Sequence, residues 1–371
     1  MATVYKFFFF LMCILPVGCK ERYEPLAVMN VNHFLVVEGF INSNGITSIR
    51  LSRTIRLSDT ARQIPETGAQ VTVEGDNNTF YLLQESEIGK YTSSQVSLPD
   101  LSLCRLRIVT NAGKEYLSEQ VPVKRVPLID SVHWERTSTG VDTYVSTHDV
   151  SNQTRYYLWQ YQEDWEFRST YPSNLEYIND QLVQRDPSIN ISRCWQTAKS
   201  TRIILATSSQ LANDVIHRIP ITHLNQGSWQ LSVKYSVSVT QYPLTKEGFE
   251  FWQNVRRNSE QLGTIFDPLP SQTAGNIRCI TTPEEPVIGF ISAGTTHEKR
   301  IFINHVEVIP WYEPTDCPEV FVTPDSVRIY FGIWGYMPEY EVRMPPGYMG
   351  SRPVCIDCRL RGSNVKPSFW P

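Results

Sequence analysis

The sequence predicts a mainly β protein, with an N-terminal immunoglobulin-like β-sandwich followed by a larger β-rich domain that carries one main α-helix and a disulfide-held irregular C-terminal tail. Three observations predict this fold class. Short segments rich in β-branched and aromatic residues recur at intervals of about ten residues, separated by turn-forming residues. Aromatic residues make up 12% of the chain and charged residues 19%, which is more typical of an extracytoplasmic β protein than of a helical cytosolic one. A single stretch has the apolar spacing of an amphipathic helix.

The first domain is predicted over residues 31–124. Residues 33–41 are rich in Val, Ile and Phe, and residues 48–55 alternate polar with apolar side chains, as a half-buried strand does. Residues 70–83 have the pattern of two strands joined by a turn. About six or seven such strands predict a β-sandwich of immunoglobulin size. The proline-punctuated residues 121–127 are predicted to be the linker that ends it.

The second domain is predicted over residues 125–371. Its helix is expected at residues 245–262, with Thr245 as the N-cap and Gly263 as the first residue beyond the C-terminus. Residues 229–239 form the clearest alternating strand pattern of the chain. The apolar residues of this run fall on one face and are Leu231, Val233, Tyr235, Val237 and Val239.

The first residues have the pattern of an export signal. A basic residue precedes the apolar run at 7–15, which is too short to span a bilayer, and Leu15-Pro-Val-Gly-Cys19 resembles the lipobox of bacterial lipoproteins. We therefore expect a signal peptide at residues 1–18 and a tether at 19–30 that is lipidated on Cys19. Three acyl chains there would make a permanent membrane anchor. The alternative is an ordinary signal peptide with an incidental cysteine.

The charged residues 20–25 follow the predicted lipidation site directly. This acid-containing stretch resembles the surface-export signal of Bacteroidetes lipoproteins, so we expect the protein at the outer membrane, facing the cell surface. A simple solvated tether is the alternative interpretation. The net charge of −4 is unfavourable for nucleic acid as a partner, because such binding calls for a clustered basic face.

Six cysteines lie beyond the predicted tether, and an even number in an exported chain favours disulfides. We expect a Cys194–Cys279 bond and a local bond within the proline-rich tail beyond residue 310, which would wrap the second domain. The candidates for the local bond are Cys317, Cys355 and Cys358. Cys104 is expected to be a buried free thiol. The Cys-x-x-Cys spacing of Cys355 and Cys358 could also suggest zinc, but no second such pair completes a metal site.

Residues 159–166 gather acids and aromatic rings. Trp159, Tyr161 and Trp165 are candidates for ligand contact by stacking, and a glycosidase would use neighbouring acids such as Glu163 and Asp164. The more ordinary interpretation is the outer face of a strand and its loop. The seven histidines do not form a metal-binding motif, and the chain has no serine nucleophile elbow or phosphate loop. We therefore predict no catalytic residues, no metal and no cofactor.

An ordered set of short motifs carries a family resemblance. It includes Phe34-Leu-Val-Val-Glu-Gly39, the helix that runs into Phe266-Asp-Pro268, Lys299-Arg-Ile-Phe-Ile303 and Cys355-Ile-Asp-Cys-Arg359. Over essentially the whole mature chain, the sequence resembles the Bacteroidetes lipoprotein family named domain of unknown function 4249. The resemblance implies an outer-membrane lipoprotein that is often encoded beside a TonB-dependent receptor. The family offers no catalytic residues to carry over.

These features together predict a non-catalytic surface lipoprotein. It would be the accessory binding or docking subunit of a TonB-dependent nutrient transporter, held to the membrane by its lipid anchor. The alternative is a free-standing adhesin or envelope structural module. A hydrolase is a third hypothesis, and it requires acids that converge on a pocket.

Overall fold

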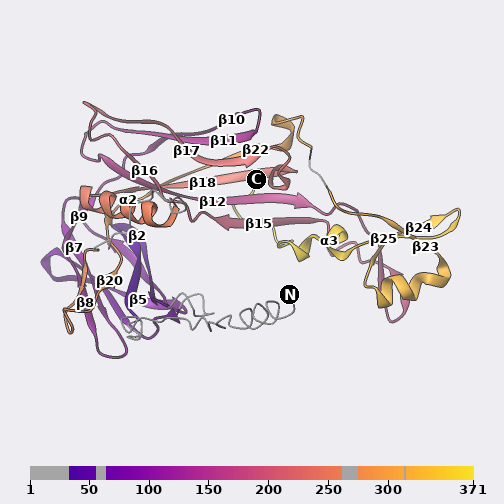
Figure 1. Ribbon diagram of the computed structural model, residues 1–371, viewed down its shortest axis with the longest axis horizontal. Coiled ribbons are helices and arrows are strands. Elements are labelled where there is room, and N and C mark those ends of the chain that lie inside the picture. The colour runs from indigo at the N-terminus through magenta and orange to yellow at the C-terminus, as the bar shows by residue number, and fades with distance from the viewer. Residues whose placement is uncertain (1–32, 56–63, 261–274, 313–314) are drawn as a thin grey trace, which may run out of the picture.

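The computed structural model describes residues 33–55, 64–260, 275–312 and 315–371. Three bodies follow one another along an elongated molecule (Figure 1), which we name the barrel, the sandwich and the distal module. Within the described residues, no helix has the length and apolar character needed to cross a membrane. The predicted signal peptide, Cys19 and the tether lie outside the described residues.

The barrel is one sheet that closes on itself. Eight strands form the ring in the order β7-β4-β5-β6-β2-β1-β21-β9, and β9 pairs with β7 to close it through Leu103–Pro122 and Cys104–Val121. The ring strands are β1 (Leu35–Asn42), β2 (Asn44–Arg53), β4 (Gln70–Gly75), β5 (Thr79–Glu87), β6 (Lys90–Ser97), β7 (Leu103–Val109), β9 (Val121–Lys124) and β21 (Ala293–Gly294). Four further strands attach to it and are β3 (Ile64–Pro65), β8 (Glu115–Ser118), β19 (Ile277–Cys279) and β20 (Val287–Ile288).

The predicted immunoglobulin-like sandwich is thus corrected to a closed, barrel-like sheet. The predicted strands exist, and their alternating residues such as Val71, Val73, Leu106 and Ile108 fill the interior. Closure depends on β21, which pairs in parallel with both β1 and β9 although it lies far along the chain. The division at residue 124 also needs correction, because residues 275–294 return to the barrel.

The sandwich packs two sheets face to face. One contains β10 (Ile129–Arg136), β11 (Gly140–Asp149) and β17 (Asp214–Asn225), and the other contains β15 (Arg193–Lys199), β12 (Tyr156–Arg168), β18 (Lys234–Pro243), β22 (His297–Asn304) and β16 (Ile204–Thr207). Side chains of both sheets form one core, for example Val145 and Ile221 with Trp159 and Val237. The predicted strand at 229–239 begins only at Lys234, because Trp229–Leu231 forms a 3₁₀ turn.

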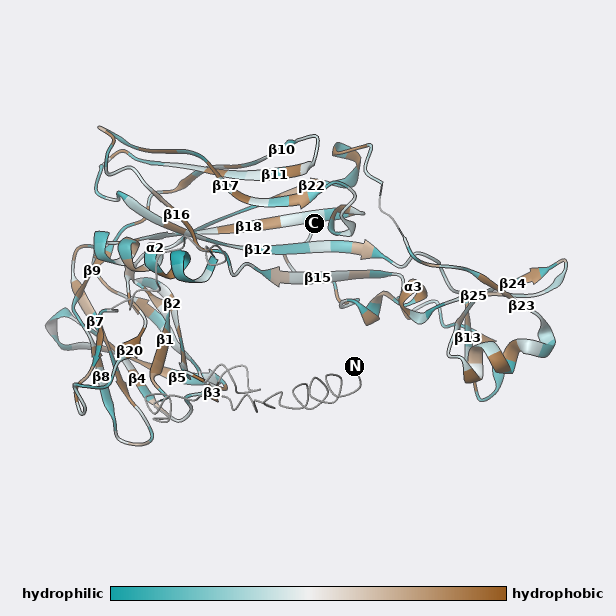
Figure 2. Ribbon diagram, viewed as in Figure 1, coloured by the Kyte–Doolittle hydropathy of each residue, from teal (hydrophilic) through white to brown (hydrophobic). Residues whose placement is uncertain are grey.

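Helix α2 (Lys246–Glu260) lies between the barrel and the sandwich (Figure 1). The Thr245 hydroxyl accepts the Gly248 N–H at 3.1 Å, so the predicted N-cap is confirmed. The helix is mostly hydrophilic (Figure 2), but Phe249 packs with Leu158 of the sandwich. Phe251 meets Phe290 of the returning segment at a ring-centroid distance of 5.4 Å. The helix therefore joins the two bodies. Its predicted end at 262 and Gly263 lie outside the described residues.

The distal module projects from the end of the sandwich (Figure 1). It contains the hairpin β13 (Leu175–Ile178) and β14 (Gln181–Gln184), and a sheet of β23 (Val320–Val322), β25 (Pro346–Ser351) and β24 (Met337–Arg343). A π-helix at Arg328–Ile333 and a 3₁₀ turn at Pro324–Ser326 join β23 to β24. The tail and the hairpin β13–β14 therefore form the distal module together, and α3 (Pro353–Ile356) and a 3₁₀ turn at Cys358–Leu360 then return the tail to the sandwich.

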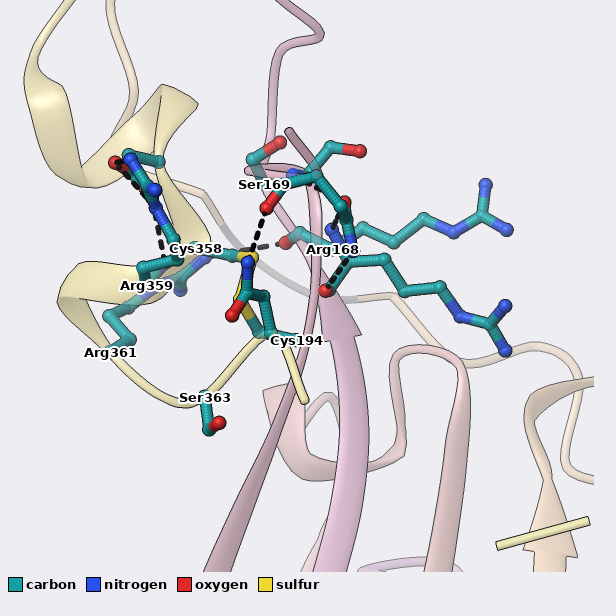
Figure 3. The surroundings of a disulfide bond; sticks show 12 residues. Arg168, Ser169, Cys194, Cys358, Arg359, Arg361 and Ser363 are labelled. Atoms are coloured by element: carbon teal, nitrogen blue, oxygen red, sulfur yellow. Dashed lines mark hydrogen bonds and ion pairs between the residues drawn. A yellow bond between two sulfur atoms is a disulfide. The ribbon is translucent and has the colours of Figure 1, made fainter. Parts of the chain in front are cut away.

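Two disulfides fasten this tail. Cys194 bonds to Cys358, and Cys317 bonds to Cys355. Figure 3 shows the first bond, between the start of β15 and the 3₁₀ turn. The predicted Cys194–Cys279 bond is wrong, because Cys279 lies in β19 of the barrel, where it is a buried free thiol.

The other cysteine predictions agree with the structure. The local bond in the tail is confirmed as Cys317–Cys355, and Cys104 is a buried free thiol. Burial and the nearby Asp76 raise the pKa of the Cys104 thiol to about 12. The two cysteines of the Cys-x-x-Cys segment thus reach different partners, which suits a structural clamp.

Candidate functional site

A groove of about 1150 Å³ lies where the barrel meets the sandwich. The barrel contributes Asp100 and Leu101, and the connection from β9 to β10 contributes residues 124–128. The end of β11 and its loop contribute residues 148–151, and residues 295–297 form the remaining wall. Because segments from both bodies line the groove, their mutual placement creates it. Neither body contains this surface alone.

Three apolar side chains stand exposed in the groove, and we call them the apolar triad. Leu101 is 73% exposed, Leu128 69% and Val150 86%. Each belongs to a turn or a linker rather than to a strand. Most of the surface of these side chains faces solvent in the monomer, whereas a partner would bury it at a gain of about 25 cal/mol per Å².

Leu101 also has an unusual backbone conformation. Its φ angle is +65°, in the left-handed region that costs a leucine about 1–2 kcal/mol. The Leu101 N–H donates to the Val123 carbonyl at 2.9 Å, which fixes the turn against β9. A strained backbone that presents an exposed leucine is typical of a functional position.

Charged groups surround the apolar triad. The His148 ring contacts both carboxylate oxygens of Asp130 at 2.8 Å, and this hydrogen bond raises the pKa of the imidazole. Lys299 donates to the Asp130 carbonyl at 2.6 Å, which anchors that segment to β22. Arg125 lies 3.8 Å from Asp100 across the groove, with 80% of its side chain exposed. Both signs of charge are therefore available to a partner.

Asp149 shapes the loop that carries Val150. Its carboxylate accepts the backbone N–H groups of Ser151, Gln153 and Thr154, each at 2.9 Å. Burial alone would raise the pKa of this carboxyl, but these hydrogen bonds, with one from the Ser151 hydroxyl, lower it overall. Asp149 therefore stays ionised and holds the loop in one shape.

His297 lines the opposite wall. Its Nδ1 lies 3.1 Å from the Ile129 N–H, so the neutral ring can accept this hydrogen bond. Burial lowers the pKa of His297, and Lys299 lowers it further. The groove thus combines preformed backbone, exposed apolar anchors and a polar rim. This combination is typical of a surface that binds a polypeptide partner.

A family model described as domain of unknown function (DUF4249) matches residues 21–300. The chain belongs to the DUF4249 family. The match includes the whole barrel and sandwich strands up to β22, and it ends before the tail motif at 355–359. No curated protein matches the sequence. Among solved structures, the calcium binding domain CBD12 of CALX1.1 is similar at 11% identity and a TM-score of 0.13. That likeness covers 72% of this chain and 99% of the other.

The DUF4249 chain buries the three predicted ligand-contact residues. Trp159 is 0% exposed, Tyr161 8% and Trp165 3%, so the prediction of ligand contact is wrong. Strand β12 lies inside its sheet, and these odd-numbered side chains point at the facing sheet and fill the core.

The neighbouring acids do not converge on one point. Asp164 and Glu166 alternate with the core residues and lie on the opposite face of β12 from Glu163. Asp164 pairs with Arg300 at 2.6 Å, and Glu166 pairs with Arg193 at 2.7 Å. Both acids are thereby held in structural ion pairs, which is not the arrangement that the hydrolase hypothesis requires.

Glu163 faces the interior instead. Its carboxylate accepts the hydroxyl of Tyr235 at 2.5 Å, with Thr222 at 3.5 Å. Burial raises the pKa of Glu163, although both hydrogen bonds oppose the rise. Within the described ranges, no three His, Cys, Asp or Glu side chains are arranged to hold a metal ion.

Sequence reasoning missed the groove in this DUF4249 protein. Its residues come from four separated segments, and their meeting depends on the barrel–sandwich arrangement. One signal was available in the sequence, because Leu101 and Val150 are isolated apolar residues inside polar turn segments. An apolar side chain in such a turn has no strand face to join.

Proposed function

We propose that this DUF4249 protein is a non-catalytic Bacteroidetes lipoprotein that serves as the docking subunit of a TonB-dependent nutrient transporter. Lipid on Cys19 anchors it in the outer membrane, facing the cell surface. The groove between barrel and sandwich receives the receptor. The observation that carries this proposal is the exposed apolar triad inside a groove with a charged rim.

The contacts support a protein partner in particular. Leu101, Leu128 and Val150 can act as anchors that become buried, and the ion pairs of the rim can exchange partners at low cost because they are exposed. The groove walls are fixed by the Asp149 and His297 side chains, which accept backbone N–H groups, so little ordering entropy opposes binding.

A pull-down tests the proposal. C-terminally tagged protein is recovered from mildly solubilised outer membranes, and co-eluting proteins are identified and quantified. We expect a β-barrel receptor in stoichiometric amount with the wild type. Recovery without such a receptor would contradict the docking function.

The variant Leu101→Gly tests the groove itself. Glycine accepts a φ of +65° freely, so we expect the stability to stay equal or rise by up to about 1 kcal/mol in urea unfolding. Receptor recovery should nevertheless fall at least several-fold, because an anchor is lost. Ile88→Ser is the matched control, since Ile88 is also 73% exposed but lies at the β5–β6 turn. Equal recovery with both variants would place the docking surface elsewhere.

The alternative function is a free-standing adhesin or envelope module. One observation favours it: the distal module exposes Ile333 by 70%, Trp334 by 59% and Met344 by 91%. This alternative would be supported if the protein, purified without a receptor, binds an envelope or matrix protein. The binding should be lost in Trp334→Ser but kept in Leu101→Gly.

A further inference from the structure

The connection from β9 to β10 joins the barrel to the sandwich, and we call residues 124–130 the linker. Three of its carbonyl groups accept hydrogen bonds from buried side chains of the sandwich. The pairs are Thr154 to Arg125 at 2.8 Å, Gln241 to Pro127 at 2.9 Å and Thr147 to Leu128 at 3.0 Å. These bonds hold the linker on the sandwich and so contribute to the mutual placement of the two bodies.

The segment that enters β22 also lies against the linker, and we call this contact the seam. The Thr295 N–H donates to the Lys124 carbonyl at 2.9 Å, and the Thr295 hydroxyl accepts the Val126 N–H at 2.9 Å. The Ile129 N–H donates to Nδ1 of His297 at 3.1 Å. Both sides of the seam line the groove, and only the third of these bonds depends on a titratable side chain.

The direction of the third bond fixes the protonation state of His297. A backbone N–H can only donate, so Nδ1 must offer its lone pair and the ring must be neutral. Burial lowers the pKa of His297, and Lys299 lowers it further, which agrees with a neutral ring. Ile129 is buried, so a proton on Nδ1 would set two donors against each other and leave this N–H unpaired inside the protein.

Like charges surround His297. Lys299 follows two residues later on the same face of β22, and its ammonium donates to a carbonyl of β10 at 2.6 Å. Lys124 and Arg125 of the linker line the groove together with His297. On β18, the residue paired with His297 is the uncharged Gln241. A proton on His297 would therefore add a fourth cation to this part of the molecule.

The acids around the seam already have partners. These partners are the His148 ring for Asp130, backbone N–H groups of its own loop for Asp149, Arg125 for Asp100 and, on the opposite face of β22, the Ser238 hydroxyl for Glu298. None of these bonds involves His297. An added proton on its ring is thus not compensated by a neighbouring carboxylate.

We propose that His297 is a pH-dependent latch: its neutral ring holds the linker on β22, and a proton on Nδ1 releases the linker so that the barrel can move relative to the sandwich. The inference does not depend on the docking function, because it concerns the seam itself. It makes the shape of the groove respond to pH, whatever binds there.

The sign of the effect follows from the lowered pKa. A histidine with an ordinary pKa of 6.5 that is lowered in the folded protein contributes its full stability above pH 6.5. This stability is lost as the pH falls from 6.5 towards the lowered pKa. Opening of the seam should thus increase by up to about tenfold per pH unit in that window and level off below it.

His148 acts in a different window. Its hydrogen bond to Asp130 raises the pKa of the imidazole, so its contribution is complete below pH 6.5 and is lost only as the pH rises above that value. A change in the seam below pH 6.5 therefore reports on His297 and not on His148.

Hydrogen exchange of the full chain, followed by mass spectrometry between pH 5 and pH 7, tests the latch. At each pH, peptides that cover the linker are compared between the wild type and His297→Asn, so that the intrinsic pH dependence of exchange cancels. An asparagine Oδ1 can take the place of Nδ1 and accept the same N–H, but it does not titrate. We expect the wild-type linker to exchange progressively faster than that of His297→Asn below pH 6.5. Peptides of β12 serve as the internal reference.

Two further variants separate the bond from the presence of a histidine. His297→Leu cannot accept the Ile129 N–H, so we expect its linker to exchange fast already at pH 7. His305→Asn is the matched control, because His305 donates its Nδ1–H to the Leu231 carbonyl at 3.1 Å. Protonation leaves that bond intact, so this variant should follow the wild type.

Two results would refute the latch. In the first, the linkers of the wild type and His297→Asn exchange alike at every pH. In the second, the linker of His297→Leu is as protected as that of the wild type at pH 7. If His297→Leu does not fold, the comparison with His297→Asn decides alone.

Discussion

Asp164 shows at the scale of single residues how this chain uses its acids. The carboxylate is 1% exposed and receives Arg300 at 2.6 Å and the Thr197 hydroxyl at 2.6 Å. The Arg300 guanidinium also lies over the Phe369 ring at 3.9 Å from its centroid, which links the sheet to the end of the tail. The contacts of Asp164 with Arg300 and Thr197 thus replace the hydrogen bonds to water that the carboxylate loses on burial.

Removing this arginine should be costly. We expect Arg300→Met to lower the free energy of unfolding by about 3 kcal/mol, because it leaves Asp164 buried without its counter-ion. Arg278→Met is the control, since Arg278 is 78% exposed in its pair with Glu119 and should cost less than about 1 kcal/mol. Urea unfolding at pH 7 measures both. If both variants lose a similar amount of unfolding free energy, water can solvate Asp164 once Arg300 is removed, and the prediction is wrong.

At the scale of elements, the sequence predicted local structure better than pairing. Alternation located the strands, and the Thr245 cap located the start of α2, because both depend on neighbouring residues. The sequence could not identify the partner of Cys194, because the tail passes through the distal module before Cys358 reaches β15. The aromatic residues of β12 were misassigned for a similar reason: their burial depends on a second sheet.

The Cys194–Cys358 bond should hold the returning tail. We expect the double variant Cys194→Ala/Cys358→Ala to lose about 2–4 kcal/mol of unfolding free energy, because the bond spans 164 residues. Limited proteolysis should then cleave within residues 359–371. In the intact protein, this segment is held in place and its Trp370 side chain is buried. Cys317→Ala/Cys355→Ala is the comparison, with a separation of 38 residues and an effect confined to the distal module. A tail that resists protease without Cys194–Cys358 would assign the fastening to Trp195 and Ser363, which exchange backbone hydrogen bonds.

At the scale of the whole molecule, one returning segment decides the architecture. Residues 275–294 leave the sandwich, complete the barrel with β19, β20 and β21, and then lead back into β22. Buried Asn276 fixes the segment, because its side chain donates to the Ile291 carbonyl at 2.9 Å and accepts the Ile291 N–H at 2.8 Å. The same crossing places residues 295–297 in the groove wall. The segment that closes the barrel therefore also completes the groove.

This coupling predicts that the N-terminal residues do not form a domain alone. A fragment of residues 33–124 lacks β21, so β1 and β9 lose their shared neighbour, and the core loses Ile277, Ile291 and Ala293. We expect it to show no cooperative thermal transition and poor amide dispersion in NMR spectra. The same fragment joined by a flexible linker to residues 275–296 should regain both, because every ring strand is then present. The prediction is contradicted if the short fragment already unfolds cooperatively and adding residues 275–296 does not change its transition. The N-terminal residues would then be an independent domain, and the returning strands would not be needed for its fold.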